Sequence, residues 1–242
     1  MTKSVSLTND VPNDGASERL NASFGTVTGD LVKSGGPIVR LAAAATDATS
    51  LRVGISSGVT GVYGRKTGTV ELQLATDGLG TSGIGASDLS PQLVTVIGDV
   101  YRLASGQVNN PAIRLPAIRE GGTFVPQPVS ITNSSPATYS EKLDAEFVSV
   151  GGKASFSGAL AALAGAATDT SAMTLTLEST GTAGSRAGSA SVRFRSNGVG
   201  TTELPAVAVG GLASIAVTGD IYRLARPVWS GSSVSFAKVR VG

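Results

Sequence analysis

The sequence predicts an all-β protein made of two tandem antiparallel β-sandwiches. Apolar and polar residues alternate in short runs, as at Leu51, Val53 and Ile55, which is the period of a half-buried strand. Turn residues such as Asp77-Gly78 separate these runs. The chain also repeats itself once. Short strands at regular spacing, within units of about 110 residues, are typical of sandwiches.

The internal repeat fixes the domain organisation. The two copies are offset by about 120 to 124 residues, a period that indicates duplicated domains and not the turns of a solenoid. Strand-like segments and the Thr-Asp turns all recur in the same order. The matching pairs are Val5–Asn9 with Val129–Asn133, Thr46-Asp47 with Thr168-Asp169, Gly68–Thr81 with Gly188–Thr201, and Asp99–Ala104 with Asp220–Ala225.

Composition excludes several classes of function. The 242 residues include no His and no Cys, which removes the commonest general base and two common metal ligands. The net charge is +2 and the 19 basic residues are scattered, so no basic face for nucleic acid is indicated. We therefore expect no enzyme activity, no metal site, no cofactor and no nucleic-acid partner.

No apolar run approaches the roughly 18 residues that suggest a membrane span. The N-terminal residues Met1–Leu7 also lack the apolar region of a signal peptide. These features predict either a cytoplasmic chain or a mature piece of an exported protein.

One strand-like segment breaks the symmetry of the repeat. Residues Ser233–Gly242 match Ala112–Gly121, which opens the second domain, and the first domain has no copy of this segment. A phase slip between Phe236 and Val239 suggests a bulge. We accordingly predict a first sandwich at 1–106 without its opening strand, a complete second sandwich at 107–228, and a spare strand at 229–242.

The repeated motifs resemble a known family of domains. Val5–Asn9, Gly68–Gly83 and Asp99–Ala104 are similar to the choice-of-anchor repeats of bacterial surface and secreted proteins, which are immunoglobulin-like sandwiches related to abnormal-spindle/Hydin-type domains. The resemblance covers nearly the whole chain in two copies. It implies an immunoglobulin-like fold, an extracellular or cell-surface location and a structural or adhesive role. It provides no catalytic residues.

The displaced strand suggests head-to-tail assembly. A sandwich without its first strand exposes an edge that pairs readily with another chain. We expect the strand of one molecule to complete the first sandwich of the next, giving a filament unless the contacts close a ring. The expected donor residues are Val234, Phe236, Val239 and Val241, with Val5 and Leu7 lining the acceptor and Trp229 anchoring the contact.

Two alternatives stay open at this stage. In the first alternative, the chain is a piece cut out of register from a longer repeat array. In the second, it is a carbohydrate- or protein-binding module of an adhesin. A carbohydrate site needs a platform of aromatics, and the sequence has few: four Tyr, six Phe and one Trp. The acidic residues that recur in both copies are expected to have structural and not catalytic roles. Asp47 and Asp169 are expected to cap turns. Glu18 and Glu141 are expected to be isolated acids at strand edges.

Overall fold

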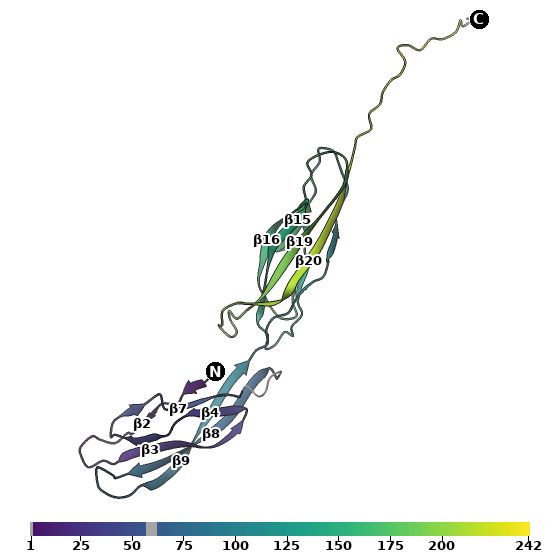
Figure 1. The fold of residues 1–242 in the computed structure, drawn as a ribbon. Coiled ribbons are helices and arrows are strands. Elements are labelled where there is room, and N and C mark those ends of the chain that lie inside the picture. The colour runs from purple at the N-terminus through teal and green to yellow at the C-terminus, as the bar shows by residue number, and fades with distance from the viewer. Residues whose placement is uncertain (1, 57–61) are drawn as a thin grey trace. The chain divides into compact units, whose positions relative to one another are not determined.

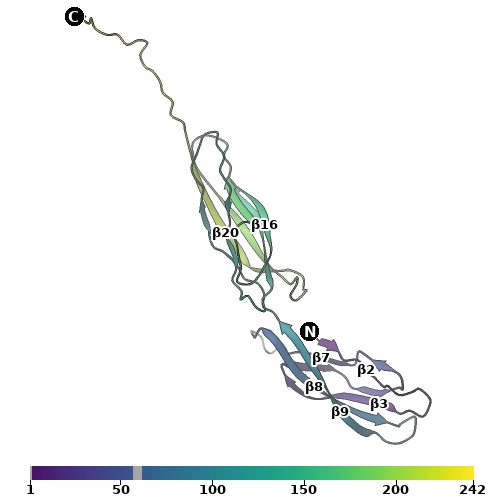
Figure 2. The same cartoon turned by 180° about the vertical axis from the view of Figure 1, so that it is seen from behind.

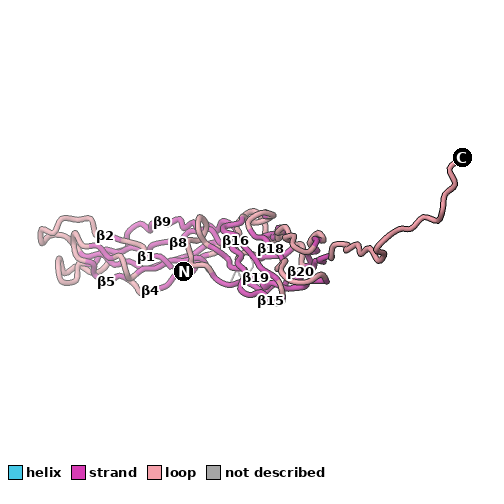
Figure 3. The backbone as a smooth tube through the Cα atoms, turned by 90° about the horizontal axis from the view of Figure 1, so that it is seen from above, coloured by secondary structure: helices cyan, strands magenta, loops and turns pink. Residues whose placement is uncertain are grey.

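In the computed structural model, residues 2–56 and 62–242 are described, and all the regular structure among them is β-strand (Figure 3). No helix in the described part of the chain is long and apolar enough to cross a membrane. The chain divides into two compact units, Met1–Arg102 and Leu103–Gly242. The predicted all-β fold class of two tandem sandwiches, the first without its opening strand, is confirmed.

The first unit contains a four-stranded antiparallel sheet in the order β5-β3-β8-β9 (Figure 1). A three-stranded sheet, β1-β7-β4, packs opposite it, and a short pair, β2-β6, lies beside them. The strands of this unit are β1 Thr2–Ser4, β2 Leu7–Thr8, β3 Arg19–Gly29, β4 Leu31–Gly35, β5 Ile38–Leu41, β6 Thr46–Asp47, β7 Leu51–Ile55, β8 Gly64–Asp77 and β9 Ser87–Val100.

The second unit repeats these strands and adds three at its beginning. Its main sheet runs β11-β20-β19-β15-β16-β18-β13, with β12 also on β20, and a second sheet runs β10-β14-β17. The strands are β10 Gly106–Val108, β11 Ala112–Arg114, β12 Ile118–Arg119, β13 Gln127–Pro128, β14 Ile131–Asn133, β15 Lys142–Gly152, β16 Ala154–Leu163, β17 Thr168–Asp169, β18 Met173–Leu177, β19 Gly184–Asn197 and β20 Val207–Tyr222.

One strand of each unit crosses from one sheet to the other. In the second unit β16 is continuous and pairs with β18 through its first half and with β15 through its second half. In the first unit the same stretch is broken at Gly36-Pro37 into β4 and β5. The Ala-rich runs at Leu41–Ala45 and Ala159–Ala167 form strand and turn.

Each unit has its own apolar core between its sheets. In the second unit one continuous cluster of 19 buried residues fills this space. In the first unit the buried residues fall into two smaller clusters, centred on Leu51 with Leu72 and on Val53 with Val70. The division between the units lies four residues before the predicted one, because residues 103–106 bond to the second unit. The N–H of Ala104, for example, donates to the Ser196 hydroxyl at 2.8 Å.

Candidate functional site: an open sheet edge and groove

The outer edge of β9 has no partner strand within residues 2–56 and 62–242. Its counterpart in the second unit, β20, is covered by β11 and β12, which pair with it in parallel. The N–H of Ala216 there donates to the Pro111 carbonyl, and the N–H of Leu115 donates to the Thr218 carbonyl, both at 2.8 Å. The repeat places Thr95 and Ile97 of β9 at these two hydrogen-bonding positions.

A groove of about 520 Å³ follows this open edge between β9 and β7. Aliphatic side chains make up most of it, and Lys3 and Asp99 supply charges. In the second unit the Phe124 ring occupies the corresponding place: a Cβ added to Gly219 would lie 2.7 Å from it. The residues around the open groove are Lys3, Val53, Gly54, Ile55, Ser56, Val96, Ile97, Gly98, Asp99, Val100 and Tyr101.

Residues beside the open edge are less buried than their counterparts in the closed unit. Val96 is half-buried, whereas the matching Val217 is 0 % exposed. The same difference separates each of the following pairs, with the half-buried residue of the first unit named first: Val5 and Val129, Leu7 and Ile131, Val94 and Ile215, Val100 and Ile221. The first unit therefore carries core side chains that a missing segment would cover.

A second open edge lies along β2. In the second unit, β10 pairs antiparallel with β14 and completes the sheet β10-β14-β17. In the first unit the corresponding sheet contains β2 and β6 alone among the described strands. The segment 104–122 thus covers two edges in the second unit, through β10 and then through β11 and β12, and both of these edges are open in the first unit.

The predicted donor residues lie in a tail that makes no strand. After β20 the chain leaves the second sandwich as an extended, exposed segment (Figures 1 and 2). Phe236 is 85 % exposed and Trp229 is 73 % exposed. Val234, Val239 and Val241 are exposed as well. No ladder in the described chain includes any of these five residues.

The tail matches the covering segment over a longer stretch than the sequence pattern suggested. Leu224–Gly242 aligns with Leu103–Gly121 without a gap, so the copy includes the β10 position as well. Val234, Phe236 and Val239 correspond to Ile113, Leu115 and Ile118, of which the first two are buried and the third half-buried. Val241 corresponds to Glu120, whose carboxylate instead accepts the N–H of Ala183 and faces Arg223. Val241 therefore has no buried apolar counterpart.

The predicted acceptor residues lie near the second open edge. Val5 and Leu7 are half-buried and pack against the cores of the first unit, but neither is among the residues that line the 520 Å³ groove. The groove is formed instead by β7 and the second half of β9. The repeat could have indicated these groove residues from the sequence alone. The part of β20 that matches the groove residues of β9 is the part that β11 and β12 cover.

The repeated acids hold turns and loops in both units. The carboxylate of Asp47 accepts the N–H groups of Ser50 and Thr49 at 2.8 and 2.9 Å, as expected of a turn cap, and these bonds lower the pKa of Asp47. The same bonds from Ala172 and Ser171 lower the pKa of Asp169.

The prediction that Glu18 and Glu141 are isolated acids was wrong. Each binds two hydroxyl groups: Ser82 and Thr76 donate to Glu18, and Thr202 and Ser196 donate to Glu141. The Ser82 hydroxyl makes the largest contribution to the lowered pKa of Glu18. The hydroxyls lie more than 50 residues away in sequence, which is why the sequence pattern did not reveal them. Among the described residues, no group of three or more acids that could hold a metal ion is present.

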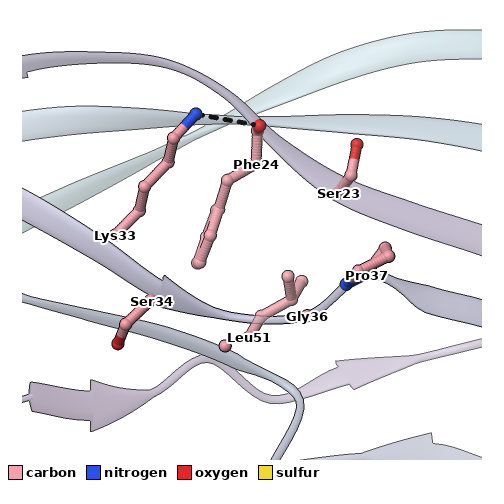
Figure 4. Close-up of a pocket in the computed structure, with 8 residues that line it drawn as sticks. Ser23, Phe24, Lys33, Ser34, Gly36, Pro37 and Leu51 are labelled. Atoms are coloured by element: carbon pink, nitrogen blue, oxygen red, sulfur yellow. Dashed lines mark hydrogen bonds between the residues drawn. The ribbon is translucent and has the colours of Figure 1, made fainter.

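A further hollow of about 360 Å³ lies at the break between β4 and β5 (Figure 4). Lys33 extends over it and donates from Nζ to the carbonyls of Phe24 and Gly25, at 3.3 and 2.8 Å. In the second unit Phe156 takes the place of Lys33 and stacks on Phe147 with ring centroids 4.7 Å apart. This hollow therefore lies where the second unit has the Phe147–Phe156 contact, and it reflects looser packing within the first sandwich.

No protein-family model matches the sequence, and no curated protein matches it. Among solved structures the chain is similar to CfaE, the adhesive subunit of CFA/I fimbria of enterotoxigenic Escherichia coli, with 11% identity, a TM-score of 0.34, and coverage of 90% of this chain and 83% of that one. It is also similar to the protocadherin gammaB4 extracellular domain, with 7% identity, a TM-score of 0.29, and coverage of 91% and 33%. The fold class rests on the strand pairing of the chain itself.

Proposed function

We propose that the protein is a structural subunit of an extracellular or cell-surface fibre that assembles head to tail with copies of itself. The tail of one subunit, residues 233–242, inserts into the groove between β7 and β9 of the next and adds a strand to the open edge of β9. The observation that carries this proposal is the second unit, where the matching segment, residues 112–121, pairs in parallel register with β20, the counterpart of β9. The surface location follows from the resemblance of the repeats to those of surface proteins.

The register of the donor strand follows from the repeat. Ile113 lies opposite Val217 and Ile118 lies opposite Ile221. Val234 is therefore expected opposite Val96, and Val239 opposite Val100, with Phe236 between them in the place of Leu115. The groove is a binding site for an extended peptide, because strand addition combines a backbone ladder with pockets for alternate side chains.

The tail and the open edge both offer apolar surface for burial. Val234, Phe236 and Val239 are exposed in the free tail, and burying each side chain contributes roughly 1.5–3 kcal/mol. Val94, Val96 and Val100 would lose their remaining exposure at the same time. These contributions and the backbone hydrogen bonds along β9 oppose the cost of association in lost freedom of motion.

The contact joins two different surfaces, so each added subunit leaves a free groove at one end and a free tail at the other. Such heterologous contacts propagate into filaments unless the rotation between subunits closes a ring. We expect purified chains to form concentration-dependent polymers, visible by sedimentation velocity and by negative-stain microscopy.

The test changes one side chain of the tail. Phe236→Asp should abolish polymer formation without altering either sandwich, because Phe236 makes no contact with them in the free chain. The matched control is Val228→Asp: Val228 is equally exposed but corresponds to Gln107, an exposed residue, and should not affect assembly. Polymerisation that survives Phe236→Asp would overturn the proposal.

A second variant fills the groove from within. Residues 225–242, followed by the linker sequence Gly122–Val125, are placed ahead of Thr2 so that the first unit receives its missing strand in the same chain. This variant should be monomeric and should unfold at a higher temperature. A wild-type chain that remains monomeric at high concentration would contradict the proposal, including the case in which the tail occupies the groove of its own molecule.

A further inference from the structure

We infer that the tail carries a second binding element, Pro227–Trp229, which adds an antiparallel strand to the free edge of β2 and packs Trp229 against Leu7. This inference rests on the proposed function and extends it. The acceptor is then not only the groove of the first unit but also its second open edge, and one continuous segment, residues 225–242, covers both.

The register follows from the second unit. There Gly106, Gln107 and Val108 lie opposite Asn133, Thr132 and Ile131. The tail and the first unit provide the same ladder with other side chains: Pro227 opposite Asn9, Val228 opposite Thr8, and Trp229 opposite Leu7. Val108 packs against the core of the second unit, so Trp229 is directed at the core of the first.

The proline is compatible with this ladder. The N–H of Asn109 donates to the Ser130 carbonyl, and the N–H of Ser134 donates to the Ser105 carbonyl. Hydrogen-bonded pairs alternate along an antiparallel ladder, which places Gly106 and Val108 in the non-hydrogen-bonded pairs between them. Pro227 takes the position of Gly106, so its missing N–H removes no ladder bond. Trp229 takes the position of Val108, in the pair type that brings facing side chains closest.

The sizes of the side chains match the tail to the first unit and not to the second. Gly106 lies so close to the Phe194 ring that a Cβ at this position would overlap it. The tail has the larger Pro227 here, and the first unit has the smaller Leu74 in place of Phe194, at the equivalent position of the β8–β9 ladder. Two positions beside the open edge of β9 agree: Val94 and Val100 are each smaller than the matching Ile215 and Ile221.

Two residues of the tail are larger than their counterparts: Phe236 replaces Leu115 and Trp229 replaces Val108. Val234 and Val239 are smaller than the matching Ile113 and Ile118. Trp229 is 73 % exposed in the free tail, and a tryptophan of this kind buries 150–250 Å² when it is covered. Val5 and Leu7 are the half-buried side chains available beneath it. The sequence predicts these three residues in the contact, and the ladder of the second unit places their counterparts together.

The test uses the fact that Trp229 is the only tryptophan of the chain. Its fluorescence therefore reports this one side chain in the full-length protein. On polymerisation, followed independently by sedimentation, the emission should shift to shorter wavelength and quenching by acrylamide should fall several-fold. Trp229→Ala should weaken polymerisation at least about 30-fold, and Trp229→Phe should restore most of the loss. Ala237→Ser lies outside Pro227–Trp229, at a position whose counterpart Pro116 is exposed and belongs to neither ladder with β20, and it should change neither readout.

The outcomes separate this inference from the proposed function. Polymers in which Trp229 keeps its exposed emission and its quenching would overturn the second element and leave the insertion of Val234 and Phe236 intact. Polymerisation unaffected by Trp229→Ala would do the same. An absence of polymers at every concentration would overturn the proposed function, and the second element with it.

Discussion

The two units share one arrangement of strands, and the largest difference between them is one connected segment. In the second unit, residues 104–122 cover both the edge of β20 and the edge of β14. In the first unit the matching edges of β9 and β2 have no partner among the residues described. The sandwiches otherwise agree even in unusual backbone: Arg40 and Ala162 have matching positive φ values of 56° and 55°.

The comparison shows how much one segment contributes to a core. With it, the apolar residues of the second unit merge into a single cluster; without it, those of the first divide into two. Side chains of the same type change from buried to half-buried without any change in the strand that carries them, as Val217 and Val96 illustrate. An open sandwich of this kind folds around most of its core and keeps the remainder available for binding.

The largest expected effect is a difference between two matched substitutions. Val217→Ala removes two methyl groups from a side chain that is 0 % exposed and should lower the free energy of unfolding of the second unit by about 2–3 kcal/mol. Val96→Ala, at the matching half-buried site, should cost the first unit about 1 kcal/mol or less in the monomer. Urea unfolding, with the transitions of the two units resolved, measures both values.

The same pair also reports whether the groove is filled. In the proposed polymers Val96 would be covered, so the cost of Val96→Ala should rise toward that of Val217→Ala. Equal costs in the monomeric protein would show that something already covers Val96, and this would remove the distinction between an open and a closed unit.

Much of the fold was predictable because it is encoded in local alternation and in the repeat. The runs at Leu51–Ile55 and Val70–Leu74 lie within β7 and β8, and the turn residues mark the ends of strands. The repeated strand-like segment Val5–Asn9 is strand only at β2, and β1 precedes it in another sheet. The chain changes sheets at Val5, whose N–H bonds the Leu51 carbonyl, and alternation alone does not report a change of sheet.

The site was only partly predictable. Alignment of the tail with Ala112–Gly121 revealed the donor, but Pro227 and Trp229 conceal the earlier part of the copy because they resemble neither Gly106 nor Val108. The groove itself joins β7 and β9, strands that are far apart in sequence and belong to different sheets. The open edges of a sandwich depend on all of its strand pairings together. No single sequence motif encodes which edges remain open.

An intermediate effect is expected at the break between β4 and β5. Lys33→Phe would place an aromatic ring over Phe24, as Phe156 lies over Phe147 in the second unit, at the cost of the Lys33 bonds to two carbonyls. Aromatic pairs contribute about 0.5–1.5 kcal/mol beyond the area they bury. We expect a stabilised first unit, measured as a higher thermal midpoint of its transition. An unchanged or lower midpoint would mean that the two bonds of Lys33 match the aromatic contact.

The smallest expected effect is shared equally by the two units, and it concerns pH. Backbone N–H bonds from Ser50 and Thr49 hold the pKa of Asp47 below its ordinary value of 3.8, and bonds from Ala172 and Ser171 do the same for the pKa of Asp169. A carboxylate whose pKa is lowered in the folded state stabilises the fold at pH values above 3.8, and this contribution is lost as the pH falls through the lower, folded-state pKa.

Asp47→Asn and Asp169→Asn should therefore each lower the thermal midpoint of their own unit at neutral pH and flatten its decline between about pH 5 and pH 2. Both turns are closed by the same bonds, so the two losses should be similar, in contrast to the unequal losses at Val96 and Val217. A pH profile that is unchanged by either substitution would show that these turns do not depend on the charge of the carboxylate. A much larger loss in one unit would show that the open groove weakens turns as well as the core.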